Sequence, residues 1–589
     1  MLKRFFENFL AVLAGLWVTI FLCFLLLMVF VGAIVSLTST DAKPDMASLK
    51  DHNVLRISLD GTVTDRATPI NLMDQLYGDN ETSLPLNDIV RALKLASEDK
   101  AIDGIMLDCK GASMGMAQMQ AIITAINQFK ESGKWVFAYS DNYTQGNYAL
   151  ACAADSIFIN PIGMVDVHGL STTVVYFKDM LDKLGVDVQV VKVGTYKSAV
   201  EPYILNDMSD ANREQTSQFL SNIWGNISEH IAKNRKVSTD TVNQWANGFL
   251  FAKATEDYVK LKVVDGMKYR HEFDDMIAAK INEDEPNYVD FTSYVSLQKN
   301  INSSKSGKQI AVLYAVGTIT ESAKDGIASE TIVPQILDLA EDDDVDGLIL
   351  RVNSGGGSAF ASEQIWEALQ QWKSITGKPF YVSMGDYAAS GGYYISCGAD
   401  RIYAEPLTLT GSIGIFGLIP NVQKLLNDKI GIHTSTVSTN TGNFPDFFRT
   451  MNPEQRAAMQ GYVERGYELF VSRCANGRHM PVDSIKAIAE GRVWDGSAAL
   501  RIGLVDKLGG LQQAIADMAS ELESAEDYYV VEYPAVKFKW WEELLDMSNQ
   551  MQSKAMENQL KEWVPYYTTI KNIKQLAPLQ ARMDYIELR

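Results

Sequence analysis

The chain has 589 residues, of which 47% are hydrophobic and 21% are charged, so it is long enough for several globular domains with buried cores. Its net charge of −20 argues against a nucleic-acid partner, because phosphate binding needs clustered lysine and arginine. The same charge disfavours broad adhesion to anionic lipid, so any membrane contact must come from an apolar segment.

Such a segment lies near the N-terminus. Residues 8–40 carry no charged side chain, and 9–37 is almost wholly apolar. This exceeds both the ~20 residues of a membrane-spanning helix and the ~7–15 of a signal-peptide core. Because Lys3 and Arg4 precede the segment, we expect a retained anchor with residues 1–8 in the cytoplasm. The chain from the linker at 38–52 onward then lies on the far side of the membrane.

Two parts of the chain repeat each other in the same order. Asp-Gly-Ile-Met-Leu-Asp at 103–108 matches Asp-Gly-Leu-Ile-Leu-Arg at 346–351, and Asn-Tyr-Ala-Leu-Ala-Cys-Ala-Ala-Asp at 147–155 matches Gly-Tyr-Tyr-Ile-Ser-Cys-Gly-Ala-Asp at 392–400. Gly-Thr-Val-Thr-Asp at 61–65 and Val-Asp at 264–265 also recur, at offsets between 241 and 256 residues. The sequence therefore predicts a tandem duplication.

We place the first repeat at 53–300 and the second at 308–522, with a polar connection between them and a tail at 523–589 that is helical in its middle. In the second repeat, short apolar runs alternate with stretches of helical periodicity. The runs predict strands at 310–316, 347–352, 380–384 and 401–404, and the periodic stretches predict helices at 330–339, 362–372 and 453–474. This alternation is typical of an α/β fold with a mostly parallel sheet.

Metal and disulfide chemistry find little support. The five cysteines have no metal-ligand spacing and make no disulfide framework, and Cys23 falls inside the apolar segment. The six histidines include no pair at i, i+4, so a zinc protease motif is absent. We expect neither a metal nor an organic cofactor.

Two segments of the second repeat are candidates for chemistry. Arg-Val-Asn-Ser-Gly-Gly-Gly-Ser at 351–358 follows a predicted strand, and its glycines let backbone N–H groups approach a ligand closely. Ser390 follows a strand that we expect to end near Met384, and it stands where a helix begins. A lone serine there is more often a helix cap than a nucleophile. By register, however, the first repeat has Gln145 in this position, so the fold does not require serine.

These segments, taken with Ala-Ala-Ser-Gly-Gly-Tyr at 388–393, Leu-Thr-Gly-Ser-Ile-Gly at 409–414 and Gly-Arg-Val-Trp-Asp-Gly at 491–496, resemble the signal peptide peptidase A family in its long, duplicated form (protease IV). The resemblance covers about residues 50–520 and extends to the anchor. It implies tandem Clp-protease/crotonase-like domains, a homotetramer and a Ser–Lys dyad that cleaves remnant signal peptides. It also implies a bacterial inner-membrane protein with most of the chain in the periplasm.

The resemblance assigns residue roles. Ser390 matches the nucleophile, and Lys197, in Val-Gly-Thr-Tyr-Lys-Ser-Ala-Val at 193–200, matches the general base. Ser412 matches the serine that hydrogen-bonds the lysine, and Gly356 and Gly391 match the donors of the oxyanion hole. The sequence departs from the family at residue 355, where a glycine replaces the usual proline and leaves the loop less rigid.

A physical argument supports Lys197 as the base. An exposed lysine has a pKa of about 10.4 and stays charged near neutrality, whereas burial without a carboxylate partner lowers the pKa and supplies a neutral amine. The second repeat has no lysine between residues 430 and 485, so each repeat holds one half of the dyad. Neither repeat should then be active alone. Whether the halves meet within one chain or between neighbouring chains is open.

Three alternatives compete with this interpretation. Gly-Ala-Ser-Met-Gly at 111–115 matches the elbow of α/β-hydrolases, with Ser113 as nucleophile and His168, His230 or His271 as a possible base. The chain could also be a catalytically inactive crotonase-like membrane scaffold. An acyl-CoA enzyme of the same broad fold conflicts with a location outside the cytoplasm. We favour a membrane-anchored serine endopeptidase that acts on signal peptides and other apolar, extended peptides.

Overall fold

The computed structural model describes residues 4, 12–25, 49, 51–67, 83–301, 307–323, 326–440, 442–443, 445–525, 527–535 and 579–583. About half of the predicted anchor at 9–37, and the predicted helical middle of the tail, fall outside these residues. Residues 12–25 form a helix. Within the described part of the chain, no helix combines the length and the hydropathy that crossing a membrane would need.

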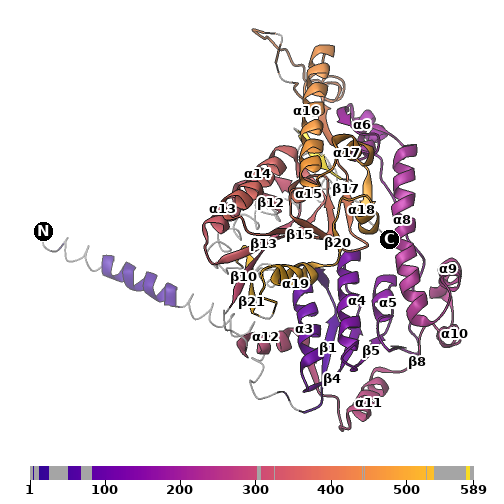
Figure 1. The fold of residues 1–589 in the computed structure, drawn as a ribbon. Helices are drawn as coiled ribbons and strands as arrows, with labels where there is room; N and C mark the ends of the chain where they lie inside the picture. Colours follow the sequence, from indigo (N-terminus) through magenta and orange to yellow (C-terminus); the bar gives the residue numbers. More distant parts are fainter. Residues whose placement is uncertain are drawn as a thin grey trace.

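The first repeat is built on a parallel sheet with the strand order β8-β6-β5-β4-β1-β9. Its strands β1, β4, β5 and β8 are labelled in the lower half of Figure 1, beside helices α3, α4 and α5. Its strands are β1 (Asn53–Leu59), β4 (Ile102–Cys109), β5 (Trp135–Ser140), β6 (Ser156–Ile159), β8 (Gly266–Met267) and β9 (Tyr288–Asp290). Its helices are α3 (Leu86–Glu98), α4 (Met116–Lys130), α5 (Gln145–Ala151), α6 (Lys178–Leu184), α7 (Glu201–Ile204), α8 (Asp210–Arg235), α9 (Thr239–Asn247), the 3-10 helix η1 (Leu250–Ala252), α10 (Thr255–Lys260), α11 (Arg270–Ile281) and α12 (Phe291–Ile301).

The second repeat has an eight-stranded sheet in which β19-β17-β15-β13-β10-β21 form the main path and β16 and β20 continue from β15. Its strands are β10 (Lys308–Val316), β13 (Val345–Ser354), β15 (Phe380–Ala389), β16 (Arg401–Ala404), β17 (Leu409–Gly411), β19 (Val493–Asp495), β20 (Lys507–Leu508) and β21 (Tyr528–Tyr533). Its helices are α13 (Ser329–Glu341), α14 (Ala359–Thr376), α15 (Gly391–Ser396), the π-helix η2 (Leu425–Ile430), α16 (Pro453–Gly477), α17 (Val482–Ile488), α18 (Gly496–Arg501) and α19 (Leu511–Glu521).

The duplication extends to single side chains. The path β6-β5-β4-β1-β9 has the same order as β16-β15-β13-β10-β21. Asp155 accepts a hydrogen bond from the backbone N–H of Val136 at 2.8 Å, and Asp400 accepts one from Phe380 at the same distance. Such a carboxylate satisfies a buried amide at the start of a strand. The repeated aspartates in the sequence therefore keep a structural role in both repeats.

The seven elements predicted in the second repeat are confirmed, with ends that differ by a few residues. The largest difference is in β15, which continues to Ala389 instead of ending near Met384. Its last residues pair with β17, so Ser390 follows the strand directly. Strand β21 lies within the segment that we expected to be a tail, yet it pairs in parallel with β10 as β9 pairs with β1.

A third sheet joins the two repeats, in the order β12-β11-β14-β22-β18-β7. Its strands are β7 (Asp187–Val193), β11 (Ile319–Thr320), β12 (Ile327–Ala328), β14 (Gly356–Ser358), β18 (Ile415–Asn421) and β22 (Leu579–Arg582). A two-stranded sheet of β2 (Thr62–Thr64) and β3 (Ser83–Pro85) completes the described strands. Because β7 comes from the first repeat, the repeats share main-chain hydrogen bonds.

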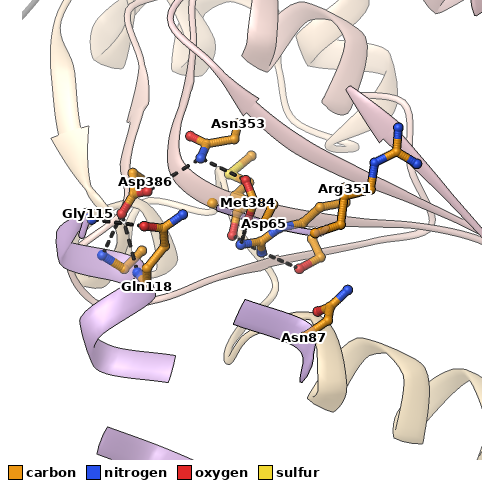
Figure 2. Close-up of polar contacts among 12 residues, drawn as sticks. Asp65, Asn87, Gly115, Gln118, Arg351, Asn353, Met384 and Asp386 are labelled. Atoms are coloured by element: carbon orange, nitrogen blue, oxygen red, sulfur yellow. Dashed lines mark hydrogen bonds and ion pairs between the residues drawn. The ribbon is translucent and has the colours of Figure 1, made fainter. Parts of the chain in front are cut away.

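Buried polar side chains also connect the repeats (Figure 2). Arg351 Nη2 of the second repeat lies 2.7 Å from Asp65 Oδ1 of the first, and each side chain is only 4% exposed. Arg351 Nη1 also donates to the carbonyl of Met384 at 2.8 Å. Asn353 Nδ2 donates to Asp65 Oδ2 at 2.9 Å, so one carboxylate of the first repeat serves two side chains of the second.

Asp386 of β15 reaches in the opposite direction, to the N-terminus of α4. Its Oδ1 accepts hydrogen bonds from the backbone N–H of Ala117 at 2.8 Å and of Gln118 at 3.3 Å (Figure 2). A carboxylate at a helix N-terminus is favoured by the free amides and the helix dipole. Burial and, next, the charge of Asp65 raise the pKa of Asp386. A Cβ on Gly115 would lie 2.1 Å from this carboxyl group, so the junction requires glycine there.

We expect Asp65→Asn to lower the free energy of unfolding by roughly 3–5 kcal/mol, because the buried Arg351 guanidinium would lose its charged partner. Urea unfolding followed by tryptophan fluorescence measures the change. Asp207→Asn is the matched control, since the Arg213–Asp207 pair is 57% and 83% exposed and its loss should leave the unfolding midpoint unchanged. Equal midpoints for Asp65→Asn and the unaltered protein would contradict a stabilising role for this pair.

Candidate active site

The candidate site lies where the ladder between β7 and β18 ends. The two strands run antiparallel, with Val193 opposite Ile415 at one end and Asp187 opposite Asn421 at the other. Lys197 comes four residues after Val193, and Ser412 comes three residues before Ile415. The register therefore brings the segments that carry Lys197 and Ser412 to the same end of the ladder, although the two residues belong to different repeats.

Lys197 meets both serines that the sequence singled out. Its Nζ lies 2.7 Å from Ser390 Oγ, 3.1 Å from Ser412 Oγ and 3.0 Å from the Ser412 carbonyl oxygen. Lys197 is 1% exposed and Ser390 is fully buried. These three partner atoms are uncharged, and burial disfavours the ammonium form of a lysine. The arrangement gives Ser390 an adjacent group that can accept its proton.

Two glycines make room for the lysine. A Cβ on Gly491 would lie 2.7 Å from the N, Cα and Cβ atoms of Lys197, and the φ of Gly491 is +79°. A Cβ on Gly414 would lie 3.3 Å from Lys197 Cδ. Glu490, next to Gly491, accepts a hydrogen bond from the backbone N–H of Tyr196 at 2.9 Å. The glycines of two sequence motifs are therefore explained by close packing against Lys197.

Ser390 does not act as a helix cap. It occupies the N-cap position of α15, but its side chain makes no capping hydrogen bond. Its backbone has φ 56° and ψ −113°, which is unusual for a residue with a side chain and marks local strain. The N–H of Ser390 donates to the Gly411 carbonyl at 2.7 Å, which holds this conformation. In the first repeat Gln145 is helical, and its amide binds the backbone of His168 and Gly169.

Gly356 and Gly391 are in contact. A Cβ on Gly356, whose φ is +97°, would lie 2.6 Å from the backbone nitrogen of Gly391. The N–H of Gly356 donates to Ser354 Oγ at 3.1 Å. To hold an oxyanion, this N–H must exchange its bond with Ser354. Gly355, where the resemblance implies proline, has open space at its Cβ position.

Gln215 of α8 is a residue of the site that the sequence did not indicate. Its Nε2 donates to the carbonyl of Tyr196 at 3.0 Å, and its Oε1 accepts from the backbone N–H of Val493 at 3.2 Å. It is 2% exposed and ties the lysine segment to β19. A single glutamine inside a long helix carries no sequence signal for this role.

The hydrolase-like elbow around Ser113 has a structural explanation. Ser113 is exposed. Its backbone N–H donates to the Gly61 carbonyl, and its carbonyl accepts a hydrogen bond from the N–H of Val63 in β2. His168 Nδ1 lies 3.0 Å from Asp166, and His230 Nε2 lies 2.9 Å from the Ala149 carbonyl. The second glycine of the elbow is Gly115, which makes room for Asp386.

Among the residues that the structure describes, no group of three His, Cys, Asp or Glu side chains is arranged to hold a metal ion. Cys109, Cys152, Cys397 and Cys474 are buried and free, as expected for cysteines that fill the core.

Comparisons with known proteins agree with the duplicated architecture. The sequence model of peptidase family S49 matches residues 128–282 and again 373–525, once in each repeat. The model of the Clp protease family matches residues 305–406, which include β10, β13, β15 and Ser390.

Curated relatives match along most of the chain. Protease 4 of Haemophilus influenzae is 34% identical over 580 residues, which cover 94% of this chain and 92% of that protein. Protease 4 of Salmonella typhi is 37% identical over 503 residues, covering 82% and 80%. The chloroplastic serine protease SPPA of Arabidopsis thaliana is 30% identical over 489 residues, covering 80% and 69%.

Proposed function

The chain belongs to peptidase family S49 and is a serine protease, and we propose that Ser390 is its nucleophile and Lys197 its general base. The observation that carries this proposal is the buried contact of 2.7 Å between Lys197 Nζ and Ser390 Oγ. A nucleophile and its base must lie within ~2.6–3.2 Å, and the contact meets that condition.

In the proposed reaction, neutral Lys197 takes the proton of Ser390, and Ser390 Oγ attacks the carbonyl carbon of a peptide bond. The backbone amides of Gly356 and Gly391 hold the oxyanion, after the Gly356 N–H leaves Ser354 Oγ. The lysine then gives its proton to the leaving amine. A water molecule, activated by the same lysine, hydrolyses the acyl-enzyme. Ser412 orients the amine through its hydroxyl and its carbonyl group.

We also propose that the substrates are remnant signal peptides and other apolar, extended peptides. Strands β14 and β18 lie on either side of β22 next to the site, and an extended peptide in the place of β22 would form the same backbone hydrogen bonds to both. Buried apolar side chains lie on the segments just before and just after Ser412, among them Leu407, Leu409, Ile413 and Ile415. Such surroundings favour apolar residues next to the bond that is cleaved.

The apolar segment at 9–37 is proposed to anchor the chain in the bacterial inner membrane, with residues from about 38 onward in the periplasm. Support comes from the length of the segment and from Lys3 and Arg4 before it. The homotetramer implied by the family resemblance is a further proposal. A single chain already contains the contact between Lys197 and Ser390, so assembly is not needed to pair them.

For the dyad, we expect Ser390→Ala, Lys197→Ala and Lys197→Arg each to lower kcat on a short apolar peptide ester by at least about 10³-fold. Arginine stays charged and cannot accept the serine proton. Ser412→Ala should cost less, because Lys197 keeps its bond to the Ser412 carbonyl. Activity of the unaltered enzyme should fall at acid pH as Lys197 becomes protonated. A fluorophosphonate should label the protein unless Ser390 is replaced.

A mixture of Ser390→Ala and Lys197→Ala chains tests whether the dyad forms within one chain or between two chains. The mixture should stay inactive, because the structure pairs the two residues of one chain. Restored activity would mean that the dyad forms between chains. A chain restricted to residues 308–589 lacks Lys197 and should also be inactive. Robust turnover by that chain, or full activity of Ser390→Ala, would refute the proposed chemistry.

Substrate preference can be measured with a peptide library. We expect cleavage after small or Leu-like residues within apolar, extended sequences, because the residues around Ser390 are apolar and buried. Folded proteins should be poor substrates, since they cannot present an extended strand. Equal turnover of charged and apolar peptides would count against this preference.

Membrane topology can be tested on spheroplasts of the host bacterium. Protease added from outside should degrade most of the chain, because the proposed orientation exposes everything after the anchor. Detergent-lysed cells provide the control for protease activity. Full protection of the chain in intact spheroplasts would reverse the orientation.

A further inference from the structure

A cavity of about 510 Å³ lies between the two repeats, and neither Lys197 nor Ser390 lines it. The first repeat contributes one wall from α3 and α4, and the second contributes the other from α19 and from the residues that follow β16 and β20. Asn87 and Arg351, both labelled in Figure 2, lie at its boundary. The cavity is therefore distinct from the proposed catalytic pair and belongs to the junction between the repeats.

Glu405 brings a buried carboxyl group to this cavity. It lines the wall and is 6% exposed, and its Oε1 would lie 2.6 Å from a Cβ on Gly510, another residue of the wall. No described side chain or backbone group makes a hydrogen bond or an ion pair with this carboxyl group. Arg351 acts on it through its charge, but all three of its guanidinium nitrogens already donate to other groups. A buried carboxylate without a partner costs free energy, so its presence needs an explanation.

The first repeat shows that the scaffold does not require a carboxylate at this position. Asn160 follows β6 directly, as Glu405 follows β16. Asn160 Nδ2 donates to Asp141 Oδ1 at 2.9 Å, and its Oδ1 accepts from the backbone N–H of Ile162 at 3.2 Å. A neutral amide with both ends satisfied thus serves the fold in one repeat, whereas the other repeat keeps an unpaired acid. The difference points to a ligand as the missing partner of Glu405.

The charges around Glu405 favour a cationic ligand. Burial raises the pKa of Glu405 to about 7, a rise that the charge of Arg351 opposes and the charge of Asp386 increases. The other titratable groups on the wall are the exposed Lys94 of α3 and the phenol of Tyr528, while α4 and α19 line it with neutral side chains. Above its pKa, Glu405 therefore presents a negative charge that a cation can neutralise.

We propose that this cavity binds a small organic amine, with the ammonium group paired to the Glu405 carboxylate and the apolar part against α3, α4 and α19. Hydrogen bonds between an ammonium group and a carboxylate are among the stronger ones. An anion would be repelled by Glu405 and Asp386, and the described residues offer no group of three side chains suited to a metal ion. Apolar side chains on the wall can cover the rest of the ligand, among them Leu86, Val90, Ala121, Phe129 and Leu511.

Two sources supply this chemistry, a free alkylamine and the N-terminus of a short apolar peptide such as a protease releases. Titration calorimetry on the full-length Ser390→Ala chain in detergent, which cannot hydrolyse a peptide if Ser390 is the nucleophile, measures both with n-pentylamine and leucyl-leucine amide. We expect Glu405→Gln to weaken the binding of each amine at least roughly tenfold, because the charged partner is lost. Glu341→Gln is the matched control, since Glu341 is exposed on α13 and its loss should leave the affinities unchanged.

The pH dependence distinguishes the two sources. Glu405 must be ionised to pair with an ammonium group, so the affinity for n-pentylamine should rise with pH through about 7 and then level off, because an alkylamine stays charged up to about pH 10. A peptide N-terminus loses its proton near pH ~8, so the affinity for leucyl-leucine amide should rise and then fall again. The amine that binds more tightly at neutral pH identifies the source.

A second variant tests the cavity without changing its charge. Ala121 Cβ lies 4.0 Å from the position of a Cβ on Gly510, so Ala121→Leu fills space beside Glu405 and should weaken both amines at least roughly tenfold. This variant replaces Glu405→Gln if the latter does not fold.

Three results would overturn the amine site. One is the absence of binding by either amine at millimolar concentration, and another is equally tight binding of the N-acetylated compounds, which carry no ammonium group. The third is a Glu405→Gln chain with a lower unfolding midpoint and unchanged amine affinity, because Glu405 would then support only the fold. None of these measurements needs turnover, so a failure of Ser390 as the nucleophile would leave the binding results standing.

Discussion

The antiparallel ladder between β7 and β18 is the interaction on which the candidate active site depends. It pairs seven residues of the first repeat with seven of the second. At one end of the ladder the chain continues from β7 to Lys197, and Ser412 lies just before β18. A slip of one residue would move the segment that carries Lys197 by about 3.3 Å relative to Ser412. The contact between Lys197 and Ser390 is therefore set by main-chain register, with Gly414 and Gly491 leaving space for the amine to reach the hydroxyl.

The polar groups buried between the repeats make the two repeats one unit. Asp65 of the first repeat accepts hydrogen bonds from Arg351 and Asn353 of the second. Asp386 of the second repeat accepts hydrogen bonds from the first turn of α4. Each group would be left buried without a partner, or returned to water, if the repeats separated. Leaving such groups unpaired costs more than the pairs themselves contribute. The same strand that holds Asp386 ends at Ala389, so the junction also fixes the approach to Ser390.

The two repeats share a scaffold and differ at the site. Asp155 and Asp400 bind equivalent backbone amides, and Arg235–Asp265 corresponds to Arg478–Asp506. At the position of Ser390, the first repeat has Gln145 in ordinary helical conformation, where its amide fixes a neighbouring loop. A strained backbone is kept only where the surrounding contacts hold it, and Ser390 has such contacts through Gly411. The duplication therefore let one copy supply the strained serine and the other the lysine.

The repeated motifs and the local periodicity of the sequence were enough to predict the duplication and the α/β alternation, whereas the family resemblance supplied Ser390, Lys197 and Ser412 as candidate residues. It also indicated glycines at 356 and 391, but not that Gly414 and Gly491 pack against the lysine. The folded chain was needed to see that Lys197 and Ser390 of one chain meet across 193 residues, and that Asp386 caps a helix of the other repeat. The position of β22 was equally hidden. Register between distant strands depends on which edges are free and which faces are buried, and neither strand's own sequence contains that information.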